Sequence, residues 1–267
     1  MNHDKQQVQD FWNDAPCGER LLSGINKQDY ENEARIRYQL EPYISEFADF
    51  ESSKNLSVLE IGVGIGADHQ RYAQAGAELY GIDLTERAVE YTRHRLAEFD
   101  LSSQCTIGDA EHLDFKNESF DLVYSWGVLH HSPDTPSAIA EVWRVLKFEG
   151  VTKIMIYHKW SLVGLMLWVR YALFALKPWQ SLDEVYAHHL ESPGTKAYTI
   201  TQAKQLFSAF DTVEIRTILT HGDLLESQAG QRHQGILLIL GRKFWPRTLL
   251  KRLFPRSGLF MLIEAKK

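Results

Sequence analysis

The sequence predicts an α/β fold in which helices cover both faces of a mostly parallel sheet. The first observation behind this prediction is that short apolar runs alternate with helical stretches from Ser57 onward, a pattern typical of parallel sheets. The second is that the first apolar run opens into glycines before a helix. The third is the composition, 44% apolar and 24% charged over 267 residues, which excludes disordered, collagen-like and fibrous classes.

The predicted elements follow in order along the chain. Gly76 ends the first helix of the alternating region, and Thr85 is the expected N-cap of the second. Gly150 precedes the fifth strand. The predicted strands cover residues 58–64, 78–84, 105–110, 120–131 with the exit loop, 151–158, 211–219 and 259–266, and the predicted helices cover 67–76, 85–99 and 136–147.

Two domains are predicted, an N-terminal helical cover at 1–50 and a main domain at 51–267. The first 50 residues look helical and mixed in polarity, with apolar residues at helical spacing in the second half. Trp12, Asn13 and Tyr38 are candidates to close over bound molecules. Packing of these side chains in the core is the alternative interpretation.

Two segments interrupt the alternating rhythm. The stretch 160–176 is apolar but contains Arg170, whereas a membrane span needs about 20 apolar residues without a central charge. We therefore expect a lid over a substrate pocket within about 159–200, or a helix lying in a membrane interface. The second segment, a basic insertion at about 220–258, is long for a connection between two strands.

The net charge of −6 is unevenly distributed. Residues 242–267 hold eight Lys or Arg against one acid, so this segment carries +7 and the other 241 residues carry −13. Aromatic and aliphatic residues between the basic ones favour peripheral contact with an anionic lipid surface, and a solvated basic helix is the alternative. The acidic balance of the whole chain argues against a nucleic-acid partner.

The cysteine count and the first residues indicate the compartment. Two cysteines, Cys17 and Cys105, form neither a disulfide framework nor a thiolate metal cage. The N-terminal residues contain no apolar signal segment. The sequence therefore predicts a cytoplasmic protein, with the basic insertion as the part that would meet the inner membrane surface.

A glycine-rich loop follows the first strand. Gly62, Gly64 and Gly66 let the backbone approach a ligand where side chains would clash, and the next helix offers N–H donors at its N-terminus. The spacing is GxGxG, not the GxGxxG of the pyrophosphate fingerprint. Asp68 in the first helical turn would also repel a pyrophosphate, which disfavours a dinucleotide and hence an oxidoreductase.

Acidic residues stand at the ends of the next strands. Asp83 ends the second strand, 21 residues after Gly62, where a carboxylate can accept from both hydroxyls of an adenosine ribose. A helix cap is its alternative role. Asp109 follows the third strand and is a candidate to accept from an adenine amino group, or to serve as a turn acid. Glu60, beside the loop, is a candidate to hold a ligand ammonium.

Five motifs in register resemble class I S-adenosylmethionine-dependent methyltransferases. They are LEIGVGIG, GIDLT, GDAEHLDF, FDLVYSWGVLHHSPD and EVWRVLKFEGVTKIMI, spanning about residues 55–158. The likeness is greatest to the small-molecule branch that includes ubiquinone and menaquinone methyltransferases. The resemblance implies a Rossmann-like seven-stranded sheet with an antiparallel last strand, and S-adenosyl-L-methionine as cofactor.

The resemblance also implies roles for individual residues. Gly62 and Gly64 match the contacts to the methionine part of the cofactor, and Asp83 matches the ribose acid. The remaining matched positions are Leu84, Asp109 and Ala110 around the adenine, and Ser125 and Trp126 beside the methionine and the reacting methyl. The sequence departs from the family pattern at 148–150, where Phe-Glu-Gly replaces a Pro-Gly-Gly type of turn in an expected loop, and at Ile65.

Methyl transfer needs neither a metal nor a covalent enzyme intermediate, and no metal site is predicted. Alignment of the reactants and exclusion of water supply ~7–11 kcal/mol in favourable cases. His130 and His131 lie just past the fourth strand and are the candidate general bases, with packing as the alternative. His158 is not grouped with them as a zinc site, because no acid or cysteine completes the set at ligand spacing. His188 and His189 are candidates for the substrate region.

The first functional hypothesis is transfer of a methyl group to a small acceptor, with apolar bulk favoured by the aromatic and aliphatic stretch at 160–186. The alternative is a catalytically inactive methyltransferase fold that binds S-adenosylmethionine or a protein partner. The acceptor atom (oxygen, nitrogen, carbon or sulfur) and the oligomeric state do not follow from the sequence.

Overall fold

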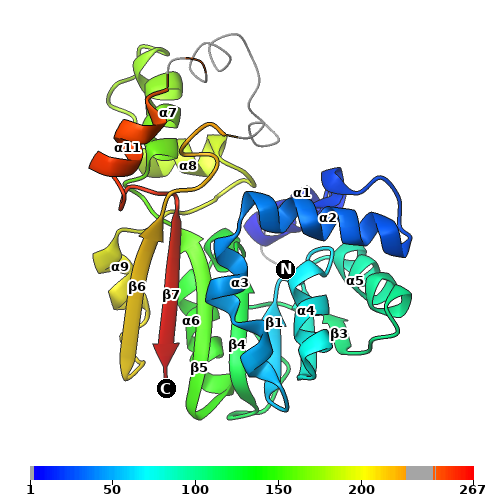
Figure 1. The fold of residues 1–267 in the computed structure, drawn as a ribbon. Helices are drawn as coiled ribbons and strands as arrows, with labels where there is room; N and C mark the ends of the chain where they lie inside the picture. The colour runs from blue at the N-terminus through cyan, green and yellow to red at the C-terminus, as the bar shows by residue number, and fades with distance from the viewer. Residues whose placement is uncertain (1–2, 227–242, 244) are drawn as a thin grey trace.

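A seven-stranded sheet forms the centre of the computed structural model, which describes residues 3–226, 243 and 245–267. The strand order is β3-β2-β1-β4-β5-β7-β6. β7 pairs antiparallel with both β5 and β6, whereas the pairs among β1 to β5 are parallel. This arrangement confirms the predicted fold class (Figure 1). The strands are β1 (Ser57–Ile61), β2 (Glu78–Asp83), β3 (Gln104–Ile107), β4 (Phe120–Trp126), β5 (Leu146–Tyr157), β6 (Thr212–Ile218) and β7 (Phe260–Lys266).

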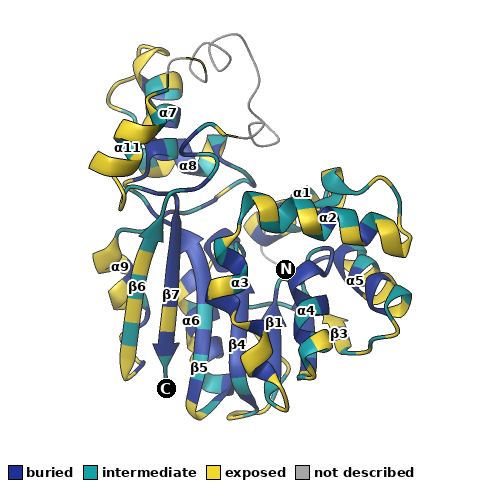
Figure 2. Ribbon diagram, in the orientation of Figure 1, coloured by how far each residue is buried: buried dark blue, intermediate teal, exposed yellow. Residues whose placement is uncertain are grey.

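Both faces of the sheet are buried by helices, as Figure 2 shows for the central strands. In β1, Val58 packs into a cluster with α3 and α4, whereas its neighbour Leu59 packs on the opposite face with α6 and α9. Successive side chains of a strand point to opposite faces, so a strand covered on both sides becomes a continuous apolar run. These helices are α3 (Tyr43–Ala48), α4 (Ala67–Ala75), α6 (Thr135–Val145) and α9 (Ile200–Leu206).

The N-terminal helices and a second helical group lie at the end of the sheet where the parallel strands terminate (Figure 1). The second group, called the cap below, packs Leu167, Val185 and Tyr186 against Tyr157 and Phe260. The N-terminal elements and α5 are α1 (His3–Asp14), η1 (Glu19–Leu21), α2 (Lys27–Leu40), η2 (Phe50–Ser53) and α5 (Glu86–Glu98). The cap comprises α7 (Leu162–Trp168), the π-helical turn η4 (Val169–Leu173), α8 (Leu182–His189) and α11 (Arg247–Leu253).

The apolar stretch 160–176 is divided between α7 and η4 and is not a single long helix. Ser161 caps α7 by accepting from the Gly164 amide. Within the residues that the structure describes, no helix has the length and apolar character needed to span a membrane. Much of the predicted basic insertion, residues 227–242 and 244, lies outside the described residues.

The structure corrects one local prediction. Residues 148–150, expected as a loop, lie inside β5, which begins at Leu146. The pairing with β4 shifts register between Phe120 and Leu122, and Glu149 takes a positive φ of 63°. A bulge therefore accommodates the Phe-Glu-Gly sequence within the strand.

Candidate active site

A cavity crosses the carboxyl ends of β1, β2 and β4, between the N-terminal helices and the cap. Its lining includes the glycine loop and acids predicted from the sequence, and also side chains from α1, α2 and β7. In an open parallel sheet, ligands bind outside the carboxyl ends of the strands. They bind where the connections from two neighbouring strands pass to opposite faces of the sheet. The predicted site residues that line the cavity are Glu60, Gly62, Gly64, Asp83, Leu84, Asp109, Ala110, Trp126 and His131.

The glycine loop is shaped by left-handed backbone conformations. Gly62 has φ 84° and Gly64 has φ 54°, values that side-chain-bearing residues rarely adopt. A Cβ atom on Gly62 would lie 2.1 Å from Cγ2 of Val128. The Gly62 amide donates to the Ile82 carbonyl at 2.8 Å. The loop is thus held against β2 with bare backbone facing the cavity.

Asp83 joins the glycine loop to the residue that caps α5. Its Oδ1 accepts from the amide and hydroxyl of Thr85, and its Oδ2 accepts from the Gly64 amide at 3.1 Å. Burial raises the pKa of this carboxyl, while the hydrogen bonds from Thr85 and Gly64 oppose the rise. Thr85 is the N-cap of α5, as predicted. The carboxylate therefore fixes the glycine loop and still borders the cavity.

Helix α1 is tied to the adenine end of the predicted site by Lys5. The Lys5 ammonium forms ion pairs with Asp109, at 2.5 Å, and with Glu111. Burial pulls the pKa of Asp109 upward, but hydrogen bonds from Lys5 and the Glu111 amide, together with the charge of Lys5, hold it below the ordinary value. Gln9 also donates to the Leu84 carbonyl at 2.8 Å. The N-terminal segment thus lies directly over the end of the cavity where the sequence predicts the cofactor, called the cofactor end below.

Glu60 and Asp68 form a buried polar group at the start of α4. Glu60 is hydrogen-bonded to His69 at 2.8 Å, and burial together with the nearby Asp68 raises the pKa of Glu60. Asp68 accepts from Arg37, Tyr38 and Tyr124. The negative charge at the helix N-terminus is therefore compensated by Arg37 of α2, a partner that the sequence did not indicate.

At the end of β4 and in the turn that follows, neighbouring site residues predicted from the sequence have different surroundings. Trp126 lines the cavity, whereas Ser125 is fully buried, donates to the Ile61 carbonyl at 2.9 Å and is not among the described residues of the lining. His131 likewise lines the cavity, and His130 lies behind it, 0% exposed. Of the two candidate bases, His131 is thus the one beside the cavity.

Comparison with known proteins identifies the central part of the chain. Residues 59–154 match a family model described as a methyltransferase domain. This segment is a class I methyltransferase domain. The match confirms, for this domain, the predicted family, enzyme class and cofactor, S-adenosyl-L-methionine.

Curated relatives cover mainly the same region. The chain is 34% identical over 118 residues to phosphoethanolamine N-methyltransferase 2 of Caenorhabditis elegans, covering 43% of this chain and 26% of the relative. It is 30% identical over 115 residues to the ubiquinone biosynthesis O-methyltransferase of Bartonella quintana, covering 43% and 47%. The chain thus spans about a quarter to a half of the length of these relatives.

Solved structures share the fold at low sequence identity. Phosphoethanolamine N-methyltransferase 2 of Haemonchus contortus, in complex with S-adenosyl-L-methionine, has a TM-score of 0.60 at 16% identity, covering 97% of this chain and 60% of that one. The YcgJ protein of Bacillus subtilis has a TM-score of 0.53 at 19% identity, covering 82% and 96%. These likenesses show a common architecture around the methyltransferase domain.

Beyond the methyltransferase motifs, the cavity continues into an aromatic chamber, called the acceptor end below. Its rings include Trp126, Tyr157 and Phe260, with Tyr157 stacked on Phe260 at a centroid distance of 5.9 Å. Cys17 and Glu41 also line this region. Burial raises the pKa of Glu41 to about 7, with Arg37 opposing the shift. The chamber therefore combines aromatic rings with a small number of polar side chains.

Three predicted cover residues have different surroundings. Trp12 lines the cavity, with its ring 5.2 Å from that of His131. Asn13 and Tyr38 are outside the described lining, and the Tyr38 hydroxyl donates to Asp68 at 2.9 Å.

The other candidate histidines, His158, His188 and His189, are also outside the described lining of the cavity. A ring nitrogen of His158 lies 3.2 Å from the Gly258 carbonyl oxygen.

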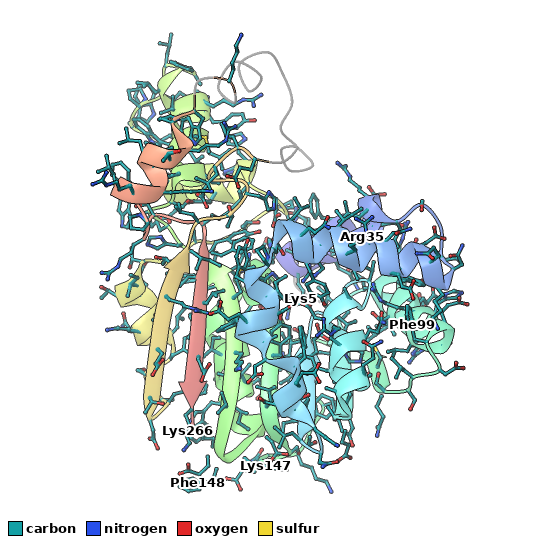
Figure 3. All side chains as sticks on the ribbon, in the orientation of Figure 1. Lys5, Arg35, Phe99, Lys147, Phe148 and Lys266 are labelled. Atoms are coloured by element: carbon teal, nitrogen blue, oxygen red, sulfur yellow. The ribbon has the colours of Figure 1, made fainter. Side chains whose placement is uncertain are left out.

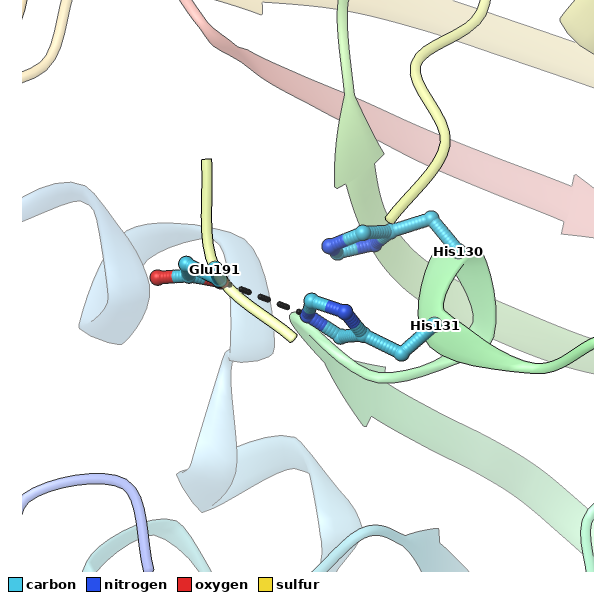
Figure 4. A group of neighbouring side chains, drawn as sticks. All are labelled: His130, His131 and Glu191. Atoms are coloured by element: carbon cyan, nitrogen blue, oxygen red, sulfur yellow. Dashed lines mark ion pairs between the residues drawn. The ribbon is translucent and has the colours of Figure 1, made fainter. Parts of the chain in front are cut away.

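Sequence reasoning missed Glu191 and Tyr157. Glu191 follows α8, and its Oε2 lies 3.3 Å from Nε2 of His131 (Figure 4). The Tyr157 hydroxyl donates to the same Oε2 at 2.7 Å. One feature of the sequence could have indicated Glu191. It begins the turn-forming sequence Glu-Ser-Pro-Gly, which follows the two histidines predicted to lie in the substrate region.

Proposed function

We propose that this protein transfers the methyl group of S-adenosylmethionine to a small acceptor with apolar bulk, by in-line displacement. The observation that carries the proposal is a single cavity that joins the glycine loop and Asp83 to the aromatic acceptor end. A donor and an acceptor bound at the two ends would be adjacent and shielded from bulk water. Two curated relatives are named phosphoethanolamine N-methyltransferase and ubiquinone biosynthesis O-methyltransferase. Their names support small molecules as the class of acceptor.

The residues at the first end suit the cofactor. A Cβ atom on Gly62 would clash with Val128, so this position requires glycine and offers bare backbone to the methionine part. We assign Asp83 to the ribose hydroxyls, Leu84, Asp109 and Ala110 to the adenine, and Glu60 to the ammonium. When bound, S-adenosylmethionine supplies an electrophilic methyl group on a sulfonium.

At the acceptor end the side chains align the acceptor and exclude water. Trp126 and Phe260 present apolar rings, and Tyr157 adds a hydroxyl beside Glu191. Alignment and exclusion of water supply ~7–11 kcal/mol in favourable cases. We place removal of the acceptor proton at His131, which lines the cavity, with His130 supporting it from behind. A positioned base contributes roughly 10²–10⁴-fold.

Binding of the cofactor is the first test. S-adenosylhomocysteine at about 100 times its dissociation constant should stabilise the chain by ~2.7 kcal/mol, measured as a thermal shift. A shift with NAD and none with S-adenosylhomocysteine would reject the proposal in favour of an oxidoreductase.

Transfer is the second test, and it separates an enzyme from a catalytically inactive fold that binds S-adenosylmethionine or a protein partner. Candidate acceptors are screened with a labelled methyl donor. Label should enter apolar small molecules, and His131→Ala should lower the turnover of any acceptor found. Binding of the product cofactor without transfer to any acceptor would favour the inactive alternative.

We further propose that the cap touches an anionic membrane from the cytoplasmic side. Phe174 and Trp179 of the cap are 68% and 79% exposed, and Leu249, Leu253 and Phe254 of the α11 region are also exposed. Arg252 and Arg256 accompany them in the sequence. Apolar side chains beside basic ones suit an anionic lipid surface.

Vesicle flotation tests this contact with a matched control. Phe174→Ser with Trp179→Ser should reduce flotation with anionic vesicles several-fold and leave the weak binding to neutral vesicles unchanged. Phe148→Ser removes an equally exposed ring, 73% accessible, at the opposite end of the sheet (Figure 3) and should float like the wild type. Equal flotation of all three proteins would reject membrane contact by the cap.

We also propose that residues 1–50 and the lid within 159–200 act as covers of the 51–267 domain. The supporting observations are that Lys5 and Trp12 border the cavity from one side and Glu191 from the other. Both covers must therefore permit entry of cofactor and acceptor.

A further inference from the structure

Three donor side chains meet at the acceptor end of the cavity, and the proposed methyl transfer does not use all of them. His130 and His131 belong to the turn η3 (Leu129–His131), and Glu191 follows α8. One ligand atom from each lies within 4.8 Å of the others. Figure 4 shows both imidazole rings extending from the same turn toward Glu191. These residues are called the His–His–Glu cluster below.

Three of the four ring nitrogens of this cluster are buried without hydrogen-bond partners. Within the described part of the chain, five buried side-chain atoms have no such partner, and three of them are Nδ1 and Nε2 of His130 and Nε2 of His131. The His130 side chain is 0% exposed. Leaving buried polar atoms unsatisfied costs free energy, so their concentration here indicates a missing ligand.

The hydroxyl groups around Nδ1 of His131 suit the tautomer that carries its proton on this nitrogen. The Thr195 hydroxyl donates to the Ser192 carbonyl at 2.7 Å, so its oxygen is left to accept from Nδ1–H of His131 at 3.1 Å. The Ser192 hydroxyl, 2.8 Å from the same nitrogen, also fits as an acceptor. With its proton on Nδ1, His131 directs the lone pair of Nε2 at Glu191.

A lone pair facing a carboxylate is unfavourable unless a positive charge lies between them. The Nε2–Oε2 distance is 3.3 Å. Both nitrogens of the buried His130 ring also lack a hydrogen-bond partner. Metal ligands of this kind bind through the lone pairs of imidazole nitrogens and carboxylate oxygens.

We propose that His130, His131 and Glu191 bind one divalent transition-metal ion of the zinc type. Two imidazoles and a carboxylate are the three-ligand set of catalytic zinc sites, which leave a fourth position open. Because His131 and Glu191 line the cavity, the open position faces the acceptor. Ser192 and Thr195 orient His131 in the way that outer partners orient metal-bound histidines, and Tyr157 holds Glu191.

The catalytic part of this inference rests on the proposed methyl transfer and gives His131 a ligand role when the ion is bound. The ion lowers the pKa of a hydroxyl or thiol bound at the open position. The acceptor proton leaves to solvent, the acceptor oxygen or sulfur forms the bond to the methyl carbon, and the bond from that carbon to the donor sulfur breaks. The acceptors that benefit are therefore hydroxyl and thiol compounds.

A second group of potential ligands, Asp109, Glu111 and His112, provides a control. Lys5 already forms ion pairs with both of its carboxylates, and the His112 side chain is 82% exposed. A cation bound there would have to displace Lys5, so this group carries no site.

Metal binding is measured directly on the full chain after removal of metals with a chelator. Zinc is titrated against a chromophoric chelator, and cobalt is added separately for its visible absorption. The wild type should bind one equivalent, and cobalt should show the intense bands of a four-coordinate site. His130→Asn and Glu191→Gln should each weaken zinc binding about 100-fold or more, whereas His112→Ala should bind like the wild type.

Folding of each variant is checked by its thermal shift with S-adenosylhomocysteine. Failure of the wild type to bind a stoichiometric ion, or unchanged affinity in Glu191→Gln, would overturn the proposed metal site. Stoichiometric zinc without any shift by S-adenosylhomocysteine would leave the ion site intact and reject the proposed methyl transfer instead. If His130→Asn does not fold, the Glu191→Gln titration decides the question alone.

Discussion

The two ends of one cavity are built in different ways. At the cofactor end, Gly62, Asp83 and Asp109 lie at or just beyond the ends of three successive strands, and much of the surface is backbone. At the acceptor end, Cys17 and Glu191 come from nearly opposite parts of the chain, and side chains supply the surface. The cofactor end is therefore specified by local sequence, whereas the acceptor end depends on how distant segments pack.

This difference indicates which substitutions each end tolerates. A binding surface made of glycine backbone cannot accept an added side chain, because the fold fixes the path of that backbone. A chamber of side chains can change one ring or hydroxyl and retain the rest. The cofactor end should therefore respond to small changes with loss of stability or affinity, and the acceptor end with loss of turnover.

The largest expected effect is that of Gly62→Ala. The new Cβ would lie 2.1 Å from Val128 at a φ of 84°, so we expect a loss of about 3 kcal/mol in unfolding free energy. Gly194→Ala is the matched control, with a φ of 77° and no atom within 4 Å of the new Cβ, and should lose about 1 kcal/mol. Equal losses in urea unfolding would show that the loop is not a tight cradle.

Asp83→Ala should weaken binding of S-adenosylhomocysteine about 30-fold, or about 2 kcal/mol, because charged hydrogen bonds to the ribose are lost. Asp114→Ala removes an exposed carboxylate of the same charge and should bind normally. Isothermal titration measures both. Unchanged affinity in Asp83→Ala would remove the main support for the cofactor end.

Tyr157→Phe should lower turnover about tenfold and leave the affinity for S-adenosylhomocysteine unchanged, since it removes only the hydroxyl that holds Glu191. Tyr80→Phe removes a hydroxyl that donates to Glu78 at 2.9 Å, outside the described lining of the cavity, and should be active. A parallel fall in cofactor affinity would mean that the two ends are not independent.

The smallest expected effect is pH-dependent. Lys5 lowers the pKa of both Asp109 and Glu111, against the effect of burial. This contribution to stability is present above the ordinary carboxyl pKa values and is lost as the pH falls through the lowered ones. Lys5→Met should therefore cost about 1 kcal/mol at pH 7, an amount discounted for solvent screening, and clearly less at pH 3.

Urea unfolding at the two pH values measures this difference. Lys116→Met, which removes an exposed ammonium, serves as the charge control and should have little effect at either pH. A cost of Lys5→Met that persists at pH 3 would mean that the Lys5 side chain acts by packing and not by charge.

The alternating strands, the Thr85 cap and the positions of Gly62 and Asp83 could be predicted because each depends on neighbouring residues. The seven-stranded sheet was implied by the family resemblance, and the order of its strands was not predicted. Hydrophobic period, turn chemistry and capping are local properties of the chain. The prediction of a loop at 148–150 was wrong for the opposite reason. The bulge in β5 depends on pairing with β4, and this pairing leaves little signal in the neighbouring sequence.

The sequence by itself determined the sheet, its glycine loop and the acids at the strand ends, because those features are encoded in short segments. Only the tertiary structure decided that Ser125 is buried, that Arg37 neutralises Asp68 and that His131 rather than His130 borders the cavity. It also brought Glu191 to a pair of histidines for which the sequence offered no completing acid. The physical reason is that packing of the cap and of α1 on the sheet sets contacts between residues far apart in the chain, and no short-range pattern reports them.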